Sequence, residues 1–194
     1  RIHQLEGRID VLSQQRARRR ARRQESAVPL VALVGYTNAG KSTIFNTMTA
    51  AGVQAQDRLF ATLDPTTRRA YVEGHGPILL TDTVGFIRSL PPDLVGAFRA
   101  TLEEIGLAKV LILVADVSDP NVHEQIAAVR QILSDLELDQ IPQVLALNKT
   151  DRVSDSDAVA LLAASLGGVP VCGLNASTLG PLWLAVQQKM GTSE

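Results

Sequence analysis

A glycine-rich segment near the start of the chain has the composition of a phosphate-binding loop. It matches the pattern G-x-x-x-x-G-K-[ST] and consists of Gly35, Tyr36, Thr37, Asn38, Ala39, Gly40, Lys41 and Ser42, with Thr43 directly after it. Glycines let backbone N–H groups approach phosphate oxygens, and a helix that begins at the lysine directs its positive end at them. The lysine would contact the β- and γ-phosphates of a nucleotide, and the serine hydroxyl would bind magnesium. Because the pattern follows the apolar run 30–34, we expect a functional loop rather than a chance turn.

An aspartate after a second apolar run is a candidate magnesium ligand. The run 78–81 is followed by Asp82-Thr83-Val84-Gly85. Strand ends of this kind border the ligand crevice in open α/β sheets. We therefore expect Asp82 to hold magnesium through water and the Gly85 amide to reach the γ-phosphate. An ordinary turn is the alternative, but the position after a phosphate loop favours the functional interpretation.

Residues 59–68 lie between these two motifs and contain several threonines. A threonine in such a segment can bind magnesium through its hydroxyl and the γ-phosphate through its amide, and release both after hydrolysis. Thr62 is the favoured candidate, and we place Phe60 and Ala61 beside the nucleotide with it. Thr66 and Thr67 are the competing candidates, although Ser/Thr clusters also serve as caps and turns. The residues expected to act on the transferred phosphoryl group are Lys41, Thr62 and Gly85.

A polar group after the apolar run 143–147 is suited to reading a base. It contains Asn148, Lys149 and Asp151. Guanine presents two adjacent donors to a carboxylate such as that of Asp151, whereas adenine would leave the carboxylate unpaired. Lys149 can lie along the base, and Asn148 can tie this segment to the phosphate loop. Asp151 could instead cap a helix, but its position near a strand end favours GTP as the ligand over ATP.

These motifs need a scaffold in which strands and helices alternate. Strands are expected at 30–34, 69–72, 78–81, 110–115, 143–147 and 169–171, and helices at 41–50, 93–105, 121–136, 155–166 and 179–190. The turn at 74–77 would pair the second and third strands as an antiparallel hairpin. The sequence therefore predicts an α/β fold with a mostly parallel six-stranded sheet, one antiparallel edge strand and helices on both faces.

The first residues of the chain differ in charge from the rest. Residues 1–25 carry eight arginines and three acidic residues, a net charge of +5, whereas the remainder carries −6. A helical seam is formed by Ile2, Leu5, Ile9 and Leu12. We predict a basic helical arm at 1–26 and one globular domain at 27–194. A basic arm points to a polyanionic partner such as RNA, with a solvated helix face as the alternative.

Composition limits the setting in which the protein works. Cys172 is the single cysteine, which excludes an internal disulfide and makes a reducing cytoplasm the expected compartment. No apolar run approaches the length that crosses a bilayer, so we expect no membrane span. The chain begins at Arg1 rather than at Met, and we expect it to be a piece of a longer protein.

Three segments together resemble one family. They read GYTNAGKST at 35–43, FATLDPTTR at 60–68 and DTVGFI at 82–87, and they are similar to HflX, the ribosome-associated GTPases. The resemblance extends from the arginine-rich helix through residue 190. It implies a Ras-like GTPase fold that binds GTP and Mg²⁺ and turns GTP into GDP. It also implies binding to the large ribosomal subunit and its RNA, ribosome splitting or rescue under stress, and a preceding domain, absent here, that packs against the seam.

Three positions qualify what the resemblance implies. Phe86 stands where Ras-type enzymes place a water-orienting glutamine, which predicts slow hydrolysis unless the ribosome assists. The last base-contacting loop usually reads Ser-Ala, whereas here it reads Cys172-Gly173-Leu174. Because the expected contact to guanine comes from backbone N–H groups, this change should be tolerated. In related GTPases an asparagine at the position of Asn38 binds K⁺, and a purely loop-stabilising role is the alternative.

Two other functions compete with that of a GTP-hydrolysing ribosome factor. One is a binding switch that hydrolyses GTP negligibly, which Phe86 favours. The other is a related GTPase of RNA modification or ribosome assembly. An ATPase or small-molecule kinase is disfavoured by the motif at 148–151.

Overall fold

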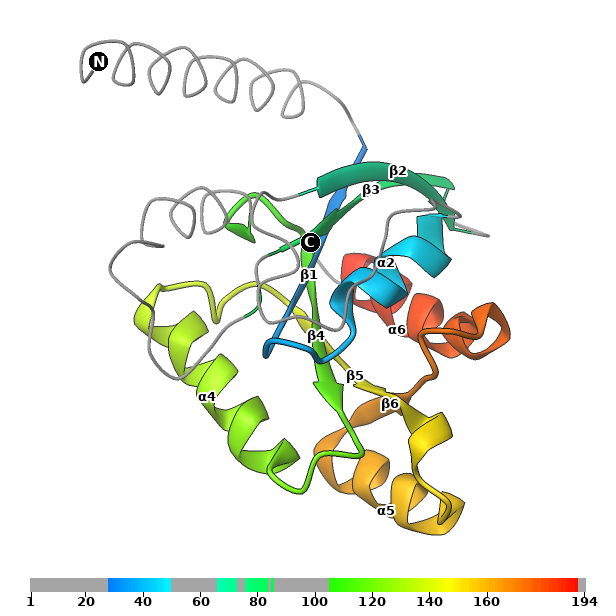
Figure 1. Cartoon of the computed structure of the whole chain (residues 1–194). Helices are drawn as coiled ribbons and strands as arrows, with labels where there is room; N and C mark the ends of the chain where they lie inside the picture. Colours follow the sequence, from blue (N-terminus) through cyan, green and yellow to red (C-terminus); the bar gives the residue numbers. More distant parts are fainter. Residues whose placement is uncertain (1–27, 50–65, 73–75, 84, 86–104, 192–194) are drawn as a thin grey trace, which may run out of the picture.

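The molecule is built on one six-stranded sheet (Figure 1). The computed structural model describes residues 28–49, 66–72, 76–83, 85 and 105–191. The strands are β1 (Leu30–Gly35), β2 (Thr66–Val72), β3 (Gly76–Asp82), β4 (Val110–Asp116), β5 (Gln143–Asn148) and β6 (Gly168–Pro170), in the order β2-β3-β1-β4-β5-β6. All neighbouring strands are parallel except β2 and β3, which pair antiparallel. The predicted sheet, including its antiparallel edge, is thus confirmed.

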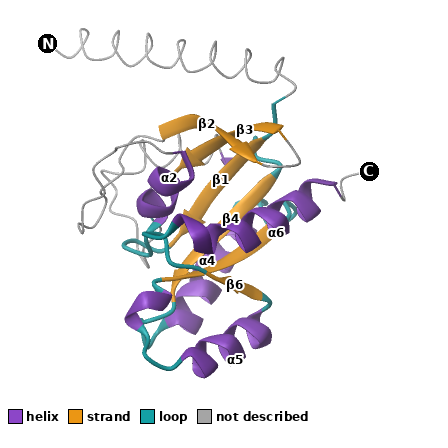
Figure 2. Ribbon diagram, turned by 90° about the vertical axis from the view of Figure 1, so that its right-hand side faces the viewer, coloured by secondary structure: helices purple, strands orange, loops and turns teal. Residues whose placement is uncertain are grey.

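Helices pack against both faces of the sheet (Figure 2). They are α2 (Lys41–Thr49), α4 (Val122–Asp135), α5 (Ser156–Leu166) and α6 (Gly180–Gly191), with short 3₁₀ turns η2 (Thr150–Arg152) and η3 (Ala176–Leu179). Apolar residues of α4 and α5 pack on one face and those of α2 and α6 on the other. Because successive strand residues point to opposite faces, central strands between two helical layers must be apolar throughout. Accordingly, all six residues of β1 are buried.

Local sequence signals explain where the elements begin and end. The Asp155 side chain accepts hydrogen bonds from the amides of Asp157 and Ala158, so it caps α5 rather than forming its first residue. The same helix ends at Gly167, whose φ of 63° suits glycine. β2 begins at Thr66, three residues before the predicted start, because it pairs with β3 as far as Thr66 opposite Asp82.

The carboxyl ends of the parallel strands meet at one edge of the sheet. β3 ends at Asp82, opposite Leu33 of β1, and β4 ends at Asp116, opposite Asn148 at the end of β5. Polar residues from distant parts of the sequence therefore line the crevice where ligands bind in such sheets.

Some predicted features lie outside the described residues. These are the basic arm, Phe86 and the helix at 93–105 apart from the buried Ile105. Within the described part of the chain, no helix combines the length and the apolar character needed to traverse a bilayer.

Candidate nucleotide-binding site

The phosphate loop (residues 35–42) connects β1 to α2 with a backbone that only glycine allows at two positions. Gly35 has φ of 148°, and a Cβ there would lie 2.2 Å from the Val114 carbonyl oxygen. Gly40 has φ of 96°, and a Cβ there would lie 2.2 Å from Nδ2 of Asn148. The glycines of the motif therefore let the loop pack closely against β4 and the end of β5.

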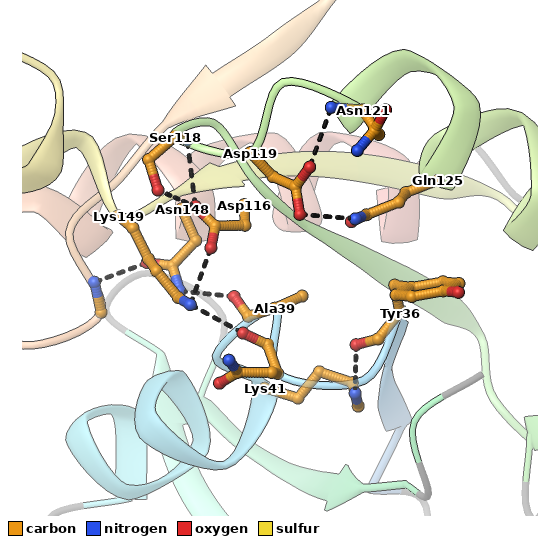
Figure 3. Close-up of polar contacts among 12 residues, drawn as sticks. Tyr36, Ala39, Lys41, Asp116, Ser118, Asp119, Asn121, Gln125, Asn148 and Lys149 are labelled. Atoms are coloured by element: carbon orange, nitrogen blue, oxygen red, sulfur yellow. Dashed lines mark hydrogen bonds and ion pairs between the residues drawn. The ribbon is translucent and has the colours of Figure 1, made fainter. Parts of the chain in front are cut away.

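Lys41 begins α2 and is buried within the loop. Its ammonium donates to the carbonyl of Tyr36 at 2.9 Å (Figure 3) and to that of Gly35 at 3.2 Å. Burial lowers the pKa of Lys41 to about 8, although the negative charge of Asp82 opposes this shift. The loop's own carbonyls thus hold the ammonium in place before any anion arrives.

Ser42 and Asp82 lie side by side at the ends of α2 and β3. The hydroxyl of Ser42 donates to Oδ2 of Asp82 at 2.6 Å. A hydroxyl and a carboxylate are hard oxygen ligands of the kind that Mg²⁺ prefers next to nucleotide phosphates. Two of the three residues predicted to hold magnesium, Ser42 and Asp82, are therefore brought together, and their chemistry fits that ion.

Gly85 approaches the phosphate loop from the other side. A Cβ at this residue would lie 2.8 Å from Cα of Thr37 and 2.9 Å from Nζ of Lys41. Thr83, two residues earlier, is buried and donates to the Leu33 carbonyl at 2.6 Å, so its side chain attaches this segment to β1. The backbone of Gly85 thus lies against the phosphate loop and the Lys41 ammonium, and its contact to the γ-phosphate stays a prediction.

Asn148 joins three loops through one side chain. Its Nδ2 donates to the Ala39 carbonyl at 2.9 Å, and its Oδ1 accepts from the Gly173 amide at 2.8 Å (Figure 3). The Gly173 carbonyl in turn accepts from the hydroxyl of Thr47 in α2. The geometry confirms the predicted tie between the base loop (residues 148–151) and the phosphate loop, and it adds the final loop (residues 171–174).

Lys149 makes a contact that sequence reasoning missed. Its ammonium lies 2.7 Å from Oδ2 of Asp116 and donates to the Asn38 carbonyl at 2.7 Å. Lys149 and Asn38 both have left-handed backbones, with φ of 65° and 61°. In the sequence, only one feature points to Asp116 as the partner of Lys149. It stands at the end of an apolar run that lies between the runs carrying the other motifs.

Asp151 and Cys172 contact each other at the expected base-binding end. The thiol of Cys172 donates to Oδ1 of Asp151 at 3.2 Å. Burial and the hydrogen bond to Asp151 raise the pKa of the Cys172 thiol, which keeps the donor protonated near neutral pH. The amides of Cys172 and Gly173 already donate to Thr178 and Asn148. The backbone contact predicted for the guanine oxygen stays a prediction, and Leu174 is exposed.

The other predicted site residues either belong to a helix or strand or lie outside the described part of the chain. Thr43 lies in the first turn of α2. The competing threonines Thr66 and Thr67 belong to β2, where the Thr67 hydroxyl donates to Thr81. The remaining members, Phe60, Ala61, Thr62 and Val84, lie outside the described residues.

Comparison with protein families identifies the fold and its motifs. The sequence model of the 50S ribosome-binding GTPases matches residues 30–149, which contain both the phosphate loop and Asn148. The chain belongs to this family.

Curated proteins that are similar to the chain agree with the assignment to the 50S ribosome-binding GTPases. The chain is 50% identical to GTPase HflX of Escherichia coli (strain K12) over 155 residues, or 80% of this chain and 36% of that protein. It is 46% identical to GTPase HflX of Magnetococcus marinus over 178 residues, or 92% of this chain and 40% of that protein. The predicted resemblance to HflX is confirmed, and the chain spans between about a third and two fifths of the length of these relatives.

Solved structures of other GTPases share the architecture. A GTP-binding protein from the archaeon Sulfolobus solfataricus in complex with GDP has a TM-score of 0.69 and 27% identity, covering 97% of this chain and 61% of that one. Era of Aquifex aeolicus bound to GDP.AlF4- has a TM-score of 0.70, covering 86% of this chain and 58% of that one, with 20% identity. The chain thus has the predicted fold, that of a Ras-like P-loop GTPase.

Proposed function

We propose that the chain binds GTP with Mg²⁺ and hydrolyses it to GDP and phosphate, as the nucleotide-dependent part of a factor for the large ribosomal subunit. The observation that carries this proposal is the arrangement of Lys41, Ser42 and Asp82 in one crevice, with Asn148 joining the base loop to it. Family membership supports it independently.

The described residues divide the work of binding between phosphates and base. Lys41 would neutralise charge on the β- and γ-phosphates, and the Gly85 amide would donate to the γ-phosphate. Ser42 and Asp82 would hold Mg²⁺, which supplies positive charge against the phosphate oxygens when it is bound. Asp151 would accept both guanine donors, and the aliphatic stem of Lys149 would lie along the base.

The catalytic half depends on residues proposed from sequence alone. Thr62 would complete the contacts of magnesium and γ-phosphate, and the side chain of Phe86 cannot orient the attacking water. We therefore expect slow hydrolysis by the isolated chain and faster hydrolysis on the ribosome, with the basic arm at 1–26 contacting ribosomal RNA phosphates. The whole protein would act in the cytoplasm in ribosome splitting or rescue, with a further N-terminal domain packed against the arm.

A binding switch with negligible hydrolysis is the second candidate, and Phe86 favours it. Phosphate release from GTP, measured with and without purified large ribosomal subunits, separates the two. Stimulation of several-fold or more supports the hydrolysing factor. Tight GTP binding with equal, near-zero release under both conditions supports the switch.

A potassium ion at Asn38 is a finer proposal for the same site. Asn38 stands at the tip of the phosphate loop with a left-handed backbone, and a monovalent cation there would offset charge that develops between the β- and γ-phosphates. Hydrolysis measured in equal concentrations of KCl and NaCl tests this, and equal rates would contradict it.

A further inference from the structure

Asp116 occupies a position that none of the nucleotide-binding motifs explains. It ends β4 in register with Asn148, between the strands that lead into the phosphate loop and the base loop. The amide of Val117 also donates to the Asn148 carbonyl at 2.9 Å, so this strand end is held against the start of the base loop. The side chain of Asp116 therefore emerges directly beside Lys149.

The two carboxylate oxygens of Asp116 have separate partners. Oδ1 accepts from the Ser118 amide at 3.0 Å and from its hydroxyl at 2.6 Å. Oδ2 lies 2.7 Å from the Lys149 ammonium. A carboxylate that only shaped its own turn would need just the first pair of contacts. The contacts of Oδ1 fix the direction of Oδ2, which forms the ion pair with Lys149.

The ion pair is sheltered enough to affect binding. The side chains of Lys149 and Asp116 are 12% and 15% exposed. Burial by itself would raise the pKa of Asp116, but hydrogen bonds from Lys149 and Ser118 outweigh it and hold that pKa below its usual range. An ion pair of this kind is screened less by water than an exposed pair and is correspondingly stronger.

Lys149 transmits this contact to the phosphate loop. Its ammonium also donates to the Asn38 carbonyl at 2.7 Å. The end of its stem lies against the loop, since a Cβ at Gly40 would lie 3.9 Å from Cε of Lys149. The Asp116 carboxylate thus restrains a lysine of the base loop that contacts the phosphate loop (Figure 3).

We propose that Asp116 is a positioning residue for nucleotide binding, which holds the Lys149 ammonium against the phosphate loop. The inference rests on the proposed binding of GTP and GDP at this site. In the absence of the carboxylate, the Lys149 side chain regains its rotamers, and ordering it again opposes nucleotide binding. Lost restraint of this kind is expressed mainly in the dissociation rate.

The test uses Asp116→Asn in the 194-residue chain, with a fluorescent GDP analogue as probe. We expect the probe to dissociate from Asp116→Asn about tenfold faster than from the wild type, because one member of a sheltered charge pair has been removed. Asp119→Asn is the matched control. Asp119 lies in the same turn, but it accepts from Asn121 and Gln125 instead of Lys149. We expect the control to release the probe at the wild-type rate.

A double-mutant cycle with Lys149→Met separates positioning from general damage to the fold. If Asp116 acts through Lys149, adding Asp116→Asn to Lys149→Met should accelerate release by less than about twofold. Independent, multiplicative effects would overturn the proposal, as would a wild-type dissociation rate for Asp116→Asn. The KM for GTP should also rise more than kcat falls, because Asp116 contacts Ser118 and Lys149 rather than Lys41 or the Ser42–Asp82 pair.

Two outcomes keep this proposal distinct from the proposed function. A wild-type chain that binds no guanine nucleotide would contradict the function and, with it, the inference that rests on it. A wild-type chain that binds GDP but is indifferent to Asp116→Asn would contradict the inference alone. If Asp116→Asn does not fold, Ser118→Ala loosens the same carboxylate, and release should accelerate about threefold. No acceleration in Ser118→Ala would then overturn the proposal.

Discussion

Ser42 and Asp82 are forty residues apart in sequence, and the hydroxyl of the first lies 2.6 Å from the carboxylate of the second. The contact exists because β1 and β3 are parallel neighbours, so that the start of α2 and the end of β3 share one edge of the sheet. It places the two predicted magnesium ligands beside the buried ammonium of Lys41.

The first prediction concerns this pair. Ser42→Ala should reduce magnesium-dependent GTP hydrolysis by about 100-fold, because one ligand of the ion is lost at a site that must be held closely. Hydrolysis measured over a MgCl₂ titration should show a higher magnesium requirement. Ser165→Ala in α5 is the control, since that hydroxyl donates only locally to the Leu162 carbonyl. An unchanged magnesium titration for Ser42→Ala would contradict the assignment.

The second prediction concerns base selection by Asp151. Asp151→Asn should weaken GTP binding by about 100-fold or more and favour xanthosine triphosphate, whose additional oxygen can accept from the new amide. Competition of GTP, xanthosine triphosphate and ATP for the same fluorescent probe measures this. Asp157→Asn in α5 should leave the order of preference unchanged. Retained preference for GTP in Asp151→Asn would show that another group reads the base.

The third prediction concerns Cys172, whose thiol donates to Asp151 at 3.2 Å. A hydroxyl is a stronger donor than a thiol, so Cys172→Ser should orient the Asp151 carboxylate better and tighten GDP binding about threefold. Cys172→Ala should weaken binding by a similar factor, since it removes the donor. Equal affinities for all three proteins, measured by calorimetry, would mean that this contact does not contribute to base binding.

The fourth prediction concerns the stability of the nucleotide-free chain. Burial lowers the pKa of Lys41 from 10.5 to about 8, so the unfolded chain binds more protons than the folded chain between these values. The free energy of unfolding should therefore rise as the pH increases from about 8 to 10.5, by at most about 3 kcal/mol. Below pH 8 the burial cost of the charged lysine is fully present.

Urea unfolding at several pH values measures this dependence. Lys41→Met removes the buried charge, so its unfolding free energy should lack the increase contributed by Lys41. Lys189→Met near the end of α6 is a control in which a lysine is lost elsewhere, and it should keep the wild-type dependence. Identical pH profiles for wild type and Lys41→Met would show that the buried ammonium is not destabilising.

The motifs that were predicted from sequence are those whose chemistry demands a fixed spacing along one segment. The phosphate loop needs Gly35, Gly40 and Lys41 at set intervals, and the structure shows the steric reason at both glycines. Asn148 was recognised in the same way. Its motif follows a buried strand and contains Asp151, a carboxylate that suits the two donors of guanine.

Other features depend on pairing across the sheet and left little trace in the sequence. Asp116 resembles any aspartate after an apolar strand, and its role emerges only when β4 and β5 bring it beside Lys149. The first residues of β2 are polar, and three of them, Thr66, Thr67 and Arg68, become strand residues by pairing with β3. Local propensity does not reveal such pairing, because the partner strand supplies the hydrogen bonds.

The side chain of Asn148 couples the stability of the phosphate loop to that of the final loop. It bonds at once to the phosphate loop and to the final loop, so neither can move far while the other stays in place. Segments coupled in this way open as one cooperative unit, with a shared free energy of local unfolding. We therefore expect nucleotide release to follow a single opening event rather than separate loosening of the base and phosphate contacts. Its rate should depend on the hydrogen bonds of the Asn148 amide as well as on the Asp116–Lys149 pair.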